Sequence, residues 1–282
     1  EQGLNIGILE NDHGAVNVDM MLLKDLEGEN CELEMIAGGC DADCHKRRFR
    51  TKLIAMGMCG YDRVIVEPSG IYDVDEFFDV LRDDPIDRWY EIGNVITVVD
   101  AKLEEKLSDE ADYLLASEAA NAGCIVLSRS QEASEKEIEN TVSHLNAAME
   151  KVQCKRRFKD EIVVKDWTAF DEADYETFLS CGYVPENYRK MHIEEGETFK
   201  SLYFMNLDKT TDEIIEAAKH ILEDKECGRV FRVKGFLKDE AGEWLELNAT
   251  HQEMRICPIP EGQEVVIVIG EELNEERIQQ YF

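Results

Sequence analysis

Three segments of the sequence place acidic, thiol or imidazole side chains directly after a short apolar run, and these are the residues that could do chemistry. The first segment follows Leu9 and carries Glu10, Asp12, His13 and, further on, Asp19. Carboxylates in this position could complete the coordination shell of a magnesium ion or position a water for hydrolysis. Each residue taken singly is more often part of a solvated loop, so the segment predicts a site only together with others.

The second segment is an apolar run that ends in an acidic residue and a turn. Residues 64–66 are followed by Glu67, Pro68, Ser69 and Gly70. In a doubly wound sheet, ligands gather at the carboxyl ends of the strands, which places Glu67 where a magnesium-linked phosphate would lie. Its carboxylate could hold the ion or a bound water, and the N–H of Gly70 could approach a terminal phosphate. A strand that simply ends in a Glu-Pro turn is an equally good interpretation of this segment.

The third segment, residues 38–45, brings two thiols and an imidazole within six positions, at Cys40, Cys44 and His45. A tetrahedral site needs three or four such ligands, and this set suits zinc or another borderline-soft metal. A single C-x-x-x-C pair is a weak signal, so without further context two unliganded reduced thiols are the better interpretation.

An alternation of strands and helices must position these segments. Buried strands are indicated by apolar runs at 4–9, 33–36, 64–66, 95–99, 125–127 and 162–164. Helical spacing lies between them at 47–58, 74–81, 109–120 and 134–152. The last helix opens with Ser134 as a plausible N-cap and Glu137 three residues later. The alternation predicts an α/β fold with a doubly wound, mostly parallel sheet covered on both faces.

The second half of the sequence has a different order of elements. An acidic stretch without a clear period predicts a linker with some helix at 169–197. After it come strands at 201–207, 229–237, 243–250, 254–257 and 264–269, and helices at 212–222 and 274–281. This order predicts a small α+β domain at 198–282, after the doubly wound α/β domain at 1–168.

Composition limits the classes of function. The 62 acidic residues against 31 basic ones give a net charge of −31, so the surface should repel a phosphate backbone and we expect no nucleic-acid partner. No apolar run approaches the roughly 18 to 20 uncharged residues that span a bilayer, so we expect no membrane partner and a cytoplasmic location. We interpret the nine scattered cysteines as reduced thiols. Cys124 lies beside an apolar run, and we expect it to behave as a small hydrophobic residue.

Taken in order, the segments resemble the CobW family of metallochaperone GTPases, relatives of the HypB and UreG nickel-insertion GTPases. That family has a strand ending in Asn-Glu-Phe-Gly with a later Asp, then Gly-Cys-x-Cys-Cys, then strands ending in Glu-x-Ser-Gly and in Val-Asp. The matching stretches are 10–19, 39–44, 67–70 and 98–100, and 229–237 looks like the Arg-x-Lys-Gly strand of the family's C-terminal domain. The resemblance implies a P-loop NTPase-like fold that binds GTP and Mg²⁺.

The resemblance also implies roles for individual residues. Those expected to act in hydrolysis are Glu67, Asp12 and Glu10. Those expected to contact the nucleotide and its Mg²⁺ are Glu67, Ser69, Gly70, Asp100, Ser128, Arg129 and Gln131. Those expected to hold Zn²⁺ or another transition metal are Cys40, Cys44, His45 and Asp19. A further metal ligand would come from a partner, from water or from one of Glu10, Asp12 and His13.

The phosphate loop is the first departure from the family pattern. No Gly-x-x-x-x-Gly-Lys-Ser/Thr occurs in the sequence, although the family places it just upstream of the strand at 4–9. Because the chain starts with Glu1 and enters this strand at once, we expect that an upstream segment is missing. Without that loop, the chain as it stands should bind and hydrolyse nucleotide poorly.

Two further departures concern base and metal recognition. Residues 128–131 are Ser-Arg-Ser-Gln where the family has Asn-Lys-x-Asp. An aspartate accepts two hydrogen bonds from guanine, whereas Gln131 offers one carbonyl oxygen and an amide donor, which leaves guanine and adenine both open. Only Cys40 maps directly onto the family's cysteine motif, and Cys44 and His45 are offset substitutes. The bound metal could therefore differ from that of the family.

We therefore expect a metal-delivery switch in which GTP binding and hydrolysis drive transfer of zinc, cobalt or nickel to a client metalloprotein or cofactor pathway. The oligomeric state, including a homodimer, stays open. The main alternative is a non-hydrolysing metal-binding or regulatory protein that keeps the fold, and a weaker one is a kinase or ligase that uses another nucleotide. The switch requires Glu67 and Cys40 at a common rim of the sheet, because coupling needs a physical route between them.

Overall fold

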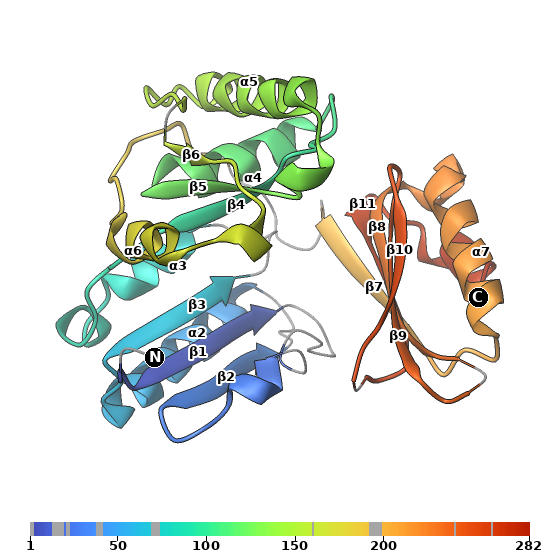
Figure 1. The fold of residues 1–282 in the computed structure, drawn as a ribbon, viewed down its shortest axis with the longest axis horizontal. Coiled ribbons are helices and arrows are strands. Elements are labelled where there is room, and N and C mark those ends of the chain that lie inside the picture. The colour runs from blue at the N-terminus through green and yellow to red at the C-terminus, as the bar shows by residue number, and fades with distance from the viewer. Residues whose placement is uncertain are drawn as a thin grey trace. The chain divides into compact units, whose positions relative to one another are not determined.

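The computed structural model describes residues 3–12, 20, 23–37, 42–68, 74–159, 161–191, 199–239, 241–260 and 262–282. At 11, 12, 37, 42–45, 75 and 76 only the backbone is described. The chain divides into two compact units (Figure 1). One is Ile71–Ile193, and the other combines Glu1–Gly70 with Glu194–Phe282.

Three parallel strands at the start of the chain form a sheet in the order β2-β1-β3. Their bounds are β1 Ile6–Asp12, β2 Cys31–Ala37 and β3 Arg63–Pro68, with a short 3-10 helix, η1, at Lys24–Leu26. β1 is central, and Ile8 pairs with Leu33 on one side and with Ile65 on the other. Because the strands are parallel, all three end at the same edge of the sheet.

One face of this sheet is covered by α2, Ala42–Cys59, which buries Phe49, Leu53 and Met56. A Cβ on Gly7 would lie 2.6 Å from the Met56 methyl carbon, so glycine at this position lets the helix approach β1 closely. A salt bridge of 2.6 Å from Lys52 of α2 to Glu34 of β2 holds the same face. Side chains alternate along a strand, so Ile8 and Glu10 point to the face opposite α2.

The unit Ile71–Ile193 contains a second parallel sheet in the order β4-β5-β6. Its strands are β4 Ile96–Asp100, β5 Cys124–Ser128 and β6 Ile162–Val163. Its helices are α3 Val74–Leu81, η2 Ile86–Arg88, α4 Asp109–Ala120, η3 Ser130–Glu132, α5 Glu135–Lys151, η4 Trp167–Ala169 and α6 Glu172–Ser180.

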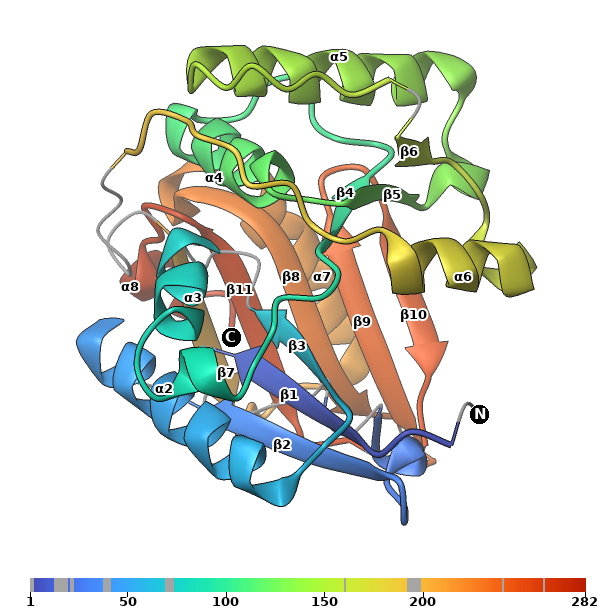
Figure 2. The same cartoon turned by 90° about the vertical axis from the view of Figure 1, so that its left-hand side faces the viewer.

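α4 and α5 lie side by side in this unit, as Figure 2 shows. Asp112 of α4 is buried and contacts His144 of α5 at 2.6 Å. The hydroxyl of Thr97 on β4 donates to the Glu118 carbonyl at 2.7 Å, which ties α4 to the sheet. Both helices therefore cover the face of the sheet to which Thr97 points.

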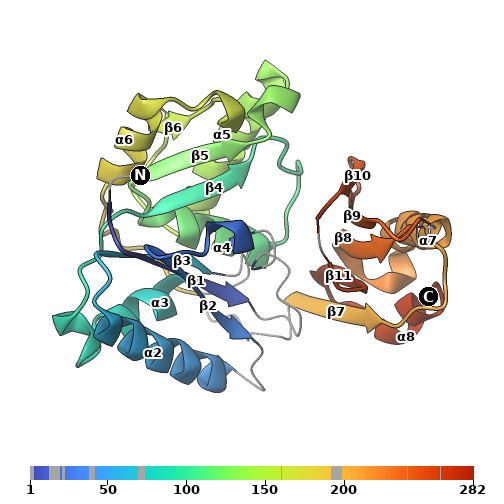
Figure 3. The ribbon, with the colours of Figure 1, turned by 60° about the horizontal axis from the view of Figure 1, so that its bottom comes forward.

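The C-terminal part is an antiparallel sheet in the order β10-β9-β8-β11-β7, with two helices. Its elements are β7 Phe199–Met205, α7 Thr211–Glu223, η5 Lys225–Cys227, β8 Arg229–Lys238, β9 Trp244–Thr250, β10 Met254–Pro258, β11 Val265–Glu271 and α8 Glu275–Gln279. Both helices lie on one side of the sheet (Figure 3), where Ile214 and Ile278 share a core with Val233 and Val268. Hydrogen bonds from Tyr281 and Arg277 of the C-terminal segment hold the pKa of Asp224 at about 2.

The predicted fold class is confirmed: parallel sheets with intervening helices precede a separate antiparallel sheet. The helices predicted at 74–81 and 109–120 have those bounds, and Ser134 and Glu137 form the predicted capping box. The stretch predicted as a linker contains α6. Several elements extend beyond the predicted ranges; in particular, β1 continues to Asp12 and α2 begins at Ala42. Among the described residues, no helix has the length and apolar character that a bilayer crossing requires.

Candidate functional site

Two carboxylates come together at the edge where β1 and β3 end. Glu10 and Glu67 are direct neighbours in the register of these strands, and Met35 of β2 flanks Glu10 on the other side. Paired residues of parallel strands point to the same face, and adjacent strands lie about 4.8 Å apart. Glu10 is buried, at 4% exposure, whereas Glu67 is exposed. The edge therefore combines an enclosed and a solvent-facing carboxylate on the face opposite α2.

This pair suits a hard divalent cation better than it suits a transition metal. Magnesium takes carboxylate and water oxygens and keeps several of its waters, so Glu67 is accessible enough to reach a hydrated ion. Two carboxylates on one face also repel each other, and a cation between them would remove that repulsion. The donor set at Glu10 and Glu67 thus fits Mg²⁺.

The strand that leads to the predicted thiol site ends at the same edge. Ala37, the last residue of β2, pairs with Asp12, the last residue of β1. α2 then begins at Ala42 and contains Cys44 and His45 in its first turn, so these two residues lie in the helix that was predicted to begin only at 47. The predicted site residues that lie outside the described residues are His13, Asp19, Cys40, Ser69 and Gly70.

Among the described side chains, no group of three or more His, Cys, Asp and Glu is placed to hold a metal. The side chains of Asp12, Cys44 and His45 do not belong to that described set. The transition-metal site predicted from the sequence therefore stays a prediction.

A second predicted group of residues lies where β4 and β5 end. Asp100 and Ser128 are direct neighbours in the register. The Asp100 carboxylate accepts hydrogen bonds from the Lys102 backbone N–H at 2.9 Å and from Arg129 Nε at 3.2 Å. It also forms an ion pair with a terminal nitrogen of Arg129. Arg129 adopts the left-handed region with φ 56°, which turns the chain directly after β5.

Further bonds hold this edge in place. The Ala101 N–H donates to the Ser128 carbonyl at 2.9 Å, and the Thr141 hydroxyl of α5 donates to the Ala101 carbonyl at 2.9 Å. Gln131 lies in η3 and is exposed. The loop after β5 is thus anchored at its base, and Gln131 is left accessible to a ligand.

Sequence reasoning placed Asp100 and Arg129 at a nucleotide site but missed that they bind each other. It also missed Thr141, which lies 40 positions from its partner Ala101. The only local signal was Lys102, two residues after Asp100, which is the spacing of an Asx-type turn. The contacts made by Arg129 and Thr141 join distant parts of the chain, so no spacing rule would have found them.

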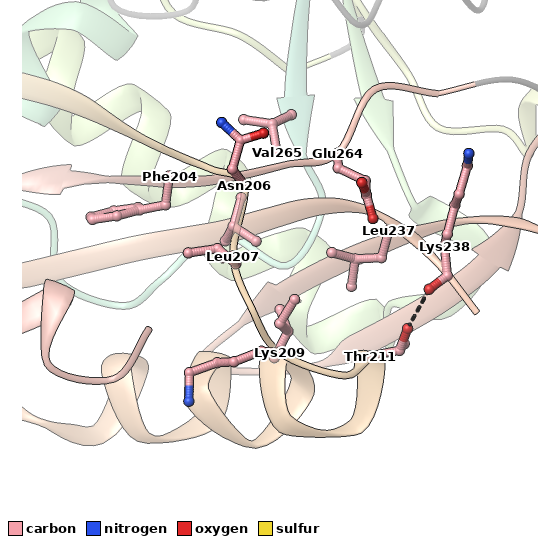
Figure 4. A pocket seen from close by; sticks show the side chains of 11 residues that line it. Phe204, Asn206, Leu207, Lys209, Thr211, Leu237, Lys238, Glu264 and Val265 are labelled. Atoms are coloured by element: carbon pink, nitrogen blue, oxygen red, sulfur yellow. Dashed lines mark hydrogen bonds between the residues drawn. The ribbon is translucent and has the colours of Figure 1, made fainter. Parts of the chain in front are cut away.

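A small cavity of the C-terminal domain does not suit a nucleotide. It lies between β7, β8, β11 and the start of α7, and it holds about 30 Å³, the room of one or two water molecules. Figure 4 shows Leu207 and Leu237 beside it and the Thr211 hydroxyl donating to the Lys238 carbonyl, at 3.0 Å. This cavity is a packing feature of the domain.

Parallel strands with acidic residues at their carboxyl ends define an α/β protein of the nucleotide-binding class. Residues 1–159 match the family described as CobW/HypB/UreG, nucleotide-binding domain. The chain belongs to this family. Membership supports, in general terms, a nucleotide-dependent role in metal handling.

The solved structures that are similar to this chain include two of YjiA GTPase. One is the Zn(II)-bound YjiA GTPase from E. coli, with 17% identity and a TM-score of 0.39, covering 100% of this chain and 90% of that one. The other is a Zn(II)-bound triple mutant of YjiA GTPase, with 15% identity, a TM-score of 0.36 and the same coverage. No curated protein matches the sequence.

Proposed function

We propose that the protein is a metal chaperone or insertase that couples binding and hydrolysis of GTP to delivery of zinc, cobalt or nickel to a client metalloprotein or cofactor pathway. One observation carries the proposal. Glu10 and Glu67 are register neighbours at the edge where β2 also ends, and β2 leads directly into the segment that contains Cys40. Because ligands of such sheets gather at the carboxyl ends of the strands, this edge could serve both a phosphate-bound cation and a thiol-bound metal.

In this mechanism the carboxylates and the thiol segment have separate tasks. Glu67 would hold Mg²⁺ or orient the attacking water, and the buried Glu10 would fix the position of the ion from the neighbouring strand. When bound, Mg²⁺ would neutralise charge on the phosphates. Cys40, Cys44, His45 and Asp19 would hold the transported metal.

α2 supplies a physical connection between the two tasks. Cys44 and His45 belong to its first turn, and the same helix packs on β1 through Met56 and on β2 through Lys52. A metal bound at the start of α2 would therefore be attached to an element that contacts two of the three strands whose ends hold the carboxylates. Nucleotide state and metal retention could then bias one another.

The exposed Gln131 supports the main alternative, a non-hydrolysing metal-binding or regulatory protein. A side chain that offers guanine one acceptor instead of two would weaken selection of GTP. In addition, Arg129 is already engaged by Asp100, so its guanidinium is less available to a base. Under this alternative, the fold persists but metal binding is independent of nucleotide.

Hydrolysis measurements on the natural full-length protein separate the two functions. GTP turnover in Mg²⁺ is measured with and without Zn²⁺, Co²⁺ and Ni²⁺, for the unaltered protein and for Glu67→Gln. The switch predicts a metal-dependent rate and a loss on the order of 10²-fold in Glu67→Gln. The control is Glu29→Gln, an exposed residue in the turn before β2, which should keep the full rate. A rate that ignores all three metals would rule out the switch.

A further inference from the structure

Helix α2 carries a concentration of positive charge in a chain that is otherwise acidic. Its 18 residues include five of the 31 basic residues of the chain and one of its 62 acidic residues. All five basic residues lie between positions 46 and 52. The helix therefore presents local positive charge on a protein whose net charge is −31.

The burial of α2 shows which of its residues face outward. Phe49, Leu53 and Met56 recur at the spacing of one helix face and are at most 1% exposed, so they define the side that packs on the sheet. Figure 3 shows α2 along one face of that sheet. Between 46 and 58 the exposed residues are Arg47, Arg48, Thr51, Ala55 and Met58, and we call them the outer stripe of α2.

The two ends of the outer stripe differ in chemistry. Arg47 and Arg48 form its amino end, and Met58, at its carboxyl end, is 77% exposed. Thr51 and Ala55 between them are small, and the Thr51 hydroxyl donates to the Arg47 carbonyl at 2.8 Å. Because a helix rises about 1.5 Å per residue, the stripe is about 16 Å long. A ligand for the whole stripe must therefore combine negative charge at one end with an apolar group at the other.

The other basic residues of α2 contribute less to this surface. Lys52 forms an ion pair with Glu34 of β2 at 2.6 Å, and Lys46 and Arg50 are half-buried. The exposed positive charge of α2 is thus concentrated at the two arginines of the outer stripe.

The sequence Lys-Arg-Arg-Phe, which begins this basic run at 46–49, occurs a second time at 155–158, in a different structural setting. There the Arg156 side chain is 9% exposed, lies over the Phe158 ring at 4.7 Å and donates to the Ala120 carbonyl at 3.1 Å. The same four residues therefore do not produce the same surface, and the second copy provides a matched control.

The size of the outer stripe selects among anionic partners. A nucleic-acid duplex or a membrane would extend beyond the stripe and meet the acidic surface around it, where repulsion acts over a Debye length of about 8 Å at physiological ionic strength. A short polypeptide segment would not. An extended segment rises about 3.3 Å per residue, so about five residues match the length of the stripe.

We propose that the outer stripe of α2 binds an acidic segment of a partner protein, with carboxylates against Arg47 and Arg48 and an apolar side chain against Met58. Arginine can hold a carboxylate through two parallel N–H···O bonds. Methionine is flexible and adapts to apolar side chains of different shape.

The position of the stripe indicates what such a partner would gain. It begins directly after Cys44 and His45, so a bound segment would bring its own protein next to residues proposed to hold the transported metal. That the partner is the client for this metal rests on the proposed function. Binding of the acidic segment does not depend on that function, because it requires neither nucleotide nor metal.

Fluorescence anisotropy of labelled peptides tests the surface. The probes are a peptide with a short run of glutamates followed by two leucines and the same peptide in reverse order. Binding to the natural full-length protein is measured with a chelator and without nucleotide. Arg47→Glu combined with Arg48→Glu should weaken the tighter-binding peptide at least about tenfold, because its carboxylates would then meet like charge.

Lys155→Glu combined with Lys159→Glu is the matched control, because it changes the net charge equally at two exposed lysines of the second basic run. It should weaken binding by less than about twofold, since the charges lie outside α2. Equal losses in the two double variants, or no binding of either peptide to the unaltered protein, would overturn the proposal.

Met58→Ala separates a contact with Met58 from a general attraction between charges. This variant should weaken the leucine-containing peptide about threefold and leave a peptide with alanines in place of the leucines unchanged. Met191→Ala, at an exposed methionine outside α2, should leave both peptides unchanged. Equal weakening of both peptides by Met58→Ala would overturn a binding mode with two different ends.

Two other anionic partners are the competing outcomes. A single-stranded oligothymidine and vesicles that contain phosphatidylserine are measured with the same protein in about 0.15 M salt. The peptide should bind at least about tenfold more tightly than the oligonucleotide, and the vesicles should not bind. Tighter binding of either competitor than of the peptide would overturn the assignment of the outer stripe to a polypeptide segment.

Discussion

In the proposed function, the choice of base depends most on a single residue, Gln131. It lies exposed in η3, directly after the turn that Arg129 makes at the end of β5. We predict that Gln131→Asp raises the preference for GTP over ATP by about 30-fold or more, because a carboxylate accepts two hydrogen bonds from guanine and such charge-assisted bonds contribute about 2 to 3 kcal/mol. The measurement is the ratio of the dissociation constants of the two nucleotides in Mg²⁺.

Gln131→Asn is the matched control, since it shortens the side chain as aspartate does but keeps the amide. It should leave the ratio near that of the unaltered protein. An unchanged ratio in Gln131→Asp would mean that residues 128–131 do not contact the base, and the carry-over of the family's base-reading motif to this loop would then be wrong.

Glu118 provides a residue-scale test of burial. It lies in α4 between Ser117 and Ala119, both fully buried, and desolvation raises the pKa of its carboxyl to about 8. The unfolded chain releases this proton near pH 4.5, so the folded state binds the extra proton between about pH 4.5 and 8. The free energy of unfolding therefore falls as pH rises through that window, because ionisation in place is unfavourable.

We predict that Glu118→Gln, which resembles the protonated carboxyl, stabilises the protein on the order of 1 to 2 kcal/mol at pH 9 and has little effect at pH 4.5. Urea unfolding at the two pH values measures this. Glu139→Gln, on the exposed side of α5, serves as the control and should give no gain. Equal effects of Glu118→Gln at both pH values would contradict the burial of this carboxyl.

At the scale of elements, helix starts with a capping signal were predictable. The side chains of Ser108 and Ser134 accept hydrogen bonds from backbone N–H groups in the first turns of α4 and α5. The two helices therefore begin at the residues that the sequence indicates. The start of α2 was not predicted, since Gly38 and Gly39 suggest a loop and the helical spacing was recognised only from residue 47 onward. β1 continues through Asn11 to Asp12, residues disfavoured in strands, because it pairs with β3 as far as Asn11 and with β2 as far as Asp12.

The capping box of α5 supports a prediction about stability. The Ser134 hydroxyl accepts from the Glu137 N–H at 3.3 Å, and the Glu137 carboxylate accepts from the Ser134 N–H at 2.8 Å. Ser134→Ala removes one of these bonds and should lower the free energy of unfolding by about 1 kcal/mol. Urea unfolding measures the change, and Glu139→Ala, exposed on the same helix, should change it by less than about 0.5 kcal/mol. Equal effects of the two variants would contradict a stabilising cap.

At the scale of the whole molecule, the sequence predicted which strands end in acidic residues but not which side chains bind each other. The convergence of Glu10, Glu67 and the end of β2 follows from parallel pairing, which brings carboxyl ends to one edge wherever strands alternate with helices. The Asp100–Arg129 ion pair and the hydrogen bond from Thr141 to the Ala101 carbonyl join residues far apart in the chain. Such contacts depend on register and loop path, which local periodicity does not encode.

The net charge of −31 affects how metal ions would bind to the chain as a whole. A strongly acidic surface concentrates divalent cations without selecting among them, so bulk metal binding does not distinguish a chaperone from a metal reservoir. What distinguishes them is coupling between nucleotide and metal. In a switch, each ligand favours one of two conformations, whereas in a reservoir the two ligands bind independently.

Coupling is reciprocal by thermodynamic necessity, which gives the sharpest prediction for the intact protein. If a non-hydrolysable GTP analogue with Mg²⁺ changes the Zn²⁺ dissociation constant by some factor, Zn²⁺ must change the affinity for the analogue by the same factor. We predict a factor between about 5 and 150, the usual range for coupled sites. Competition with a zinc-binding dye gives one side of the cycle, and a fluorescent analogue gives the other. A factor of one on both sides would mean that metal held at the edge of β1, β2 and β3 is insensitive to the nucleotide bound there. That result would establish that the protein is a metal reservoir.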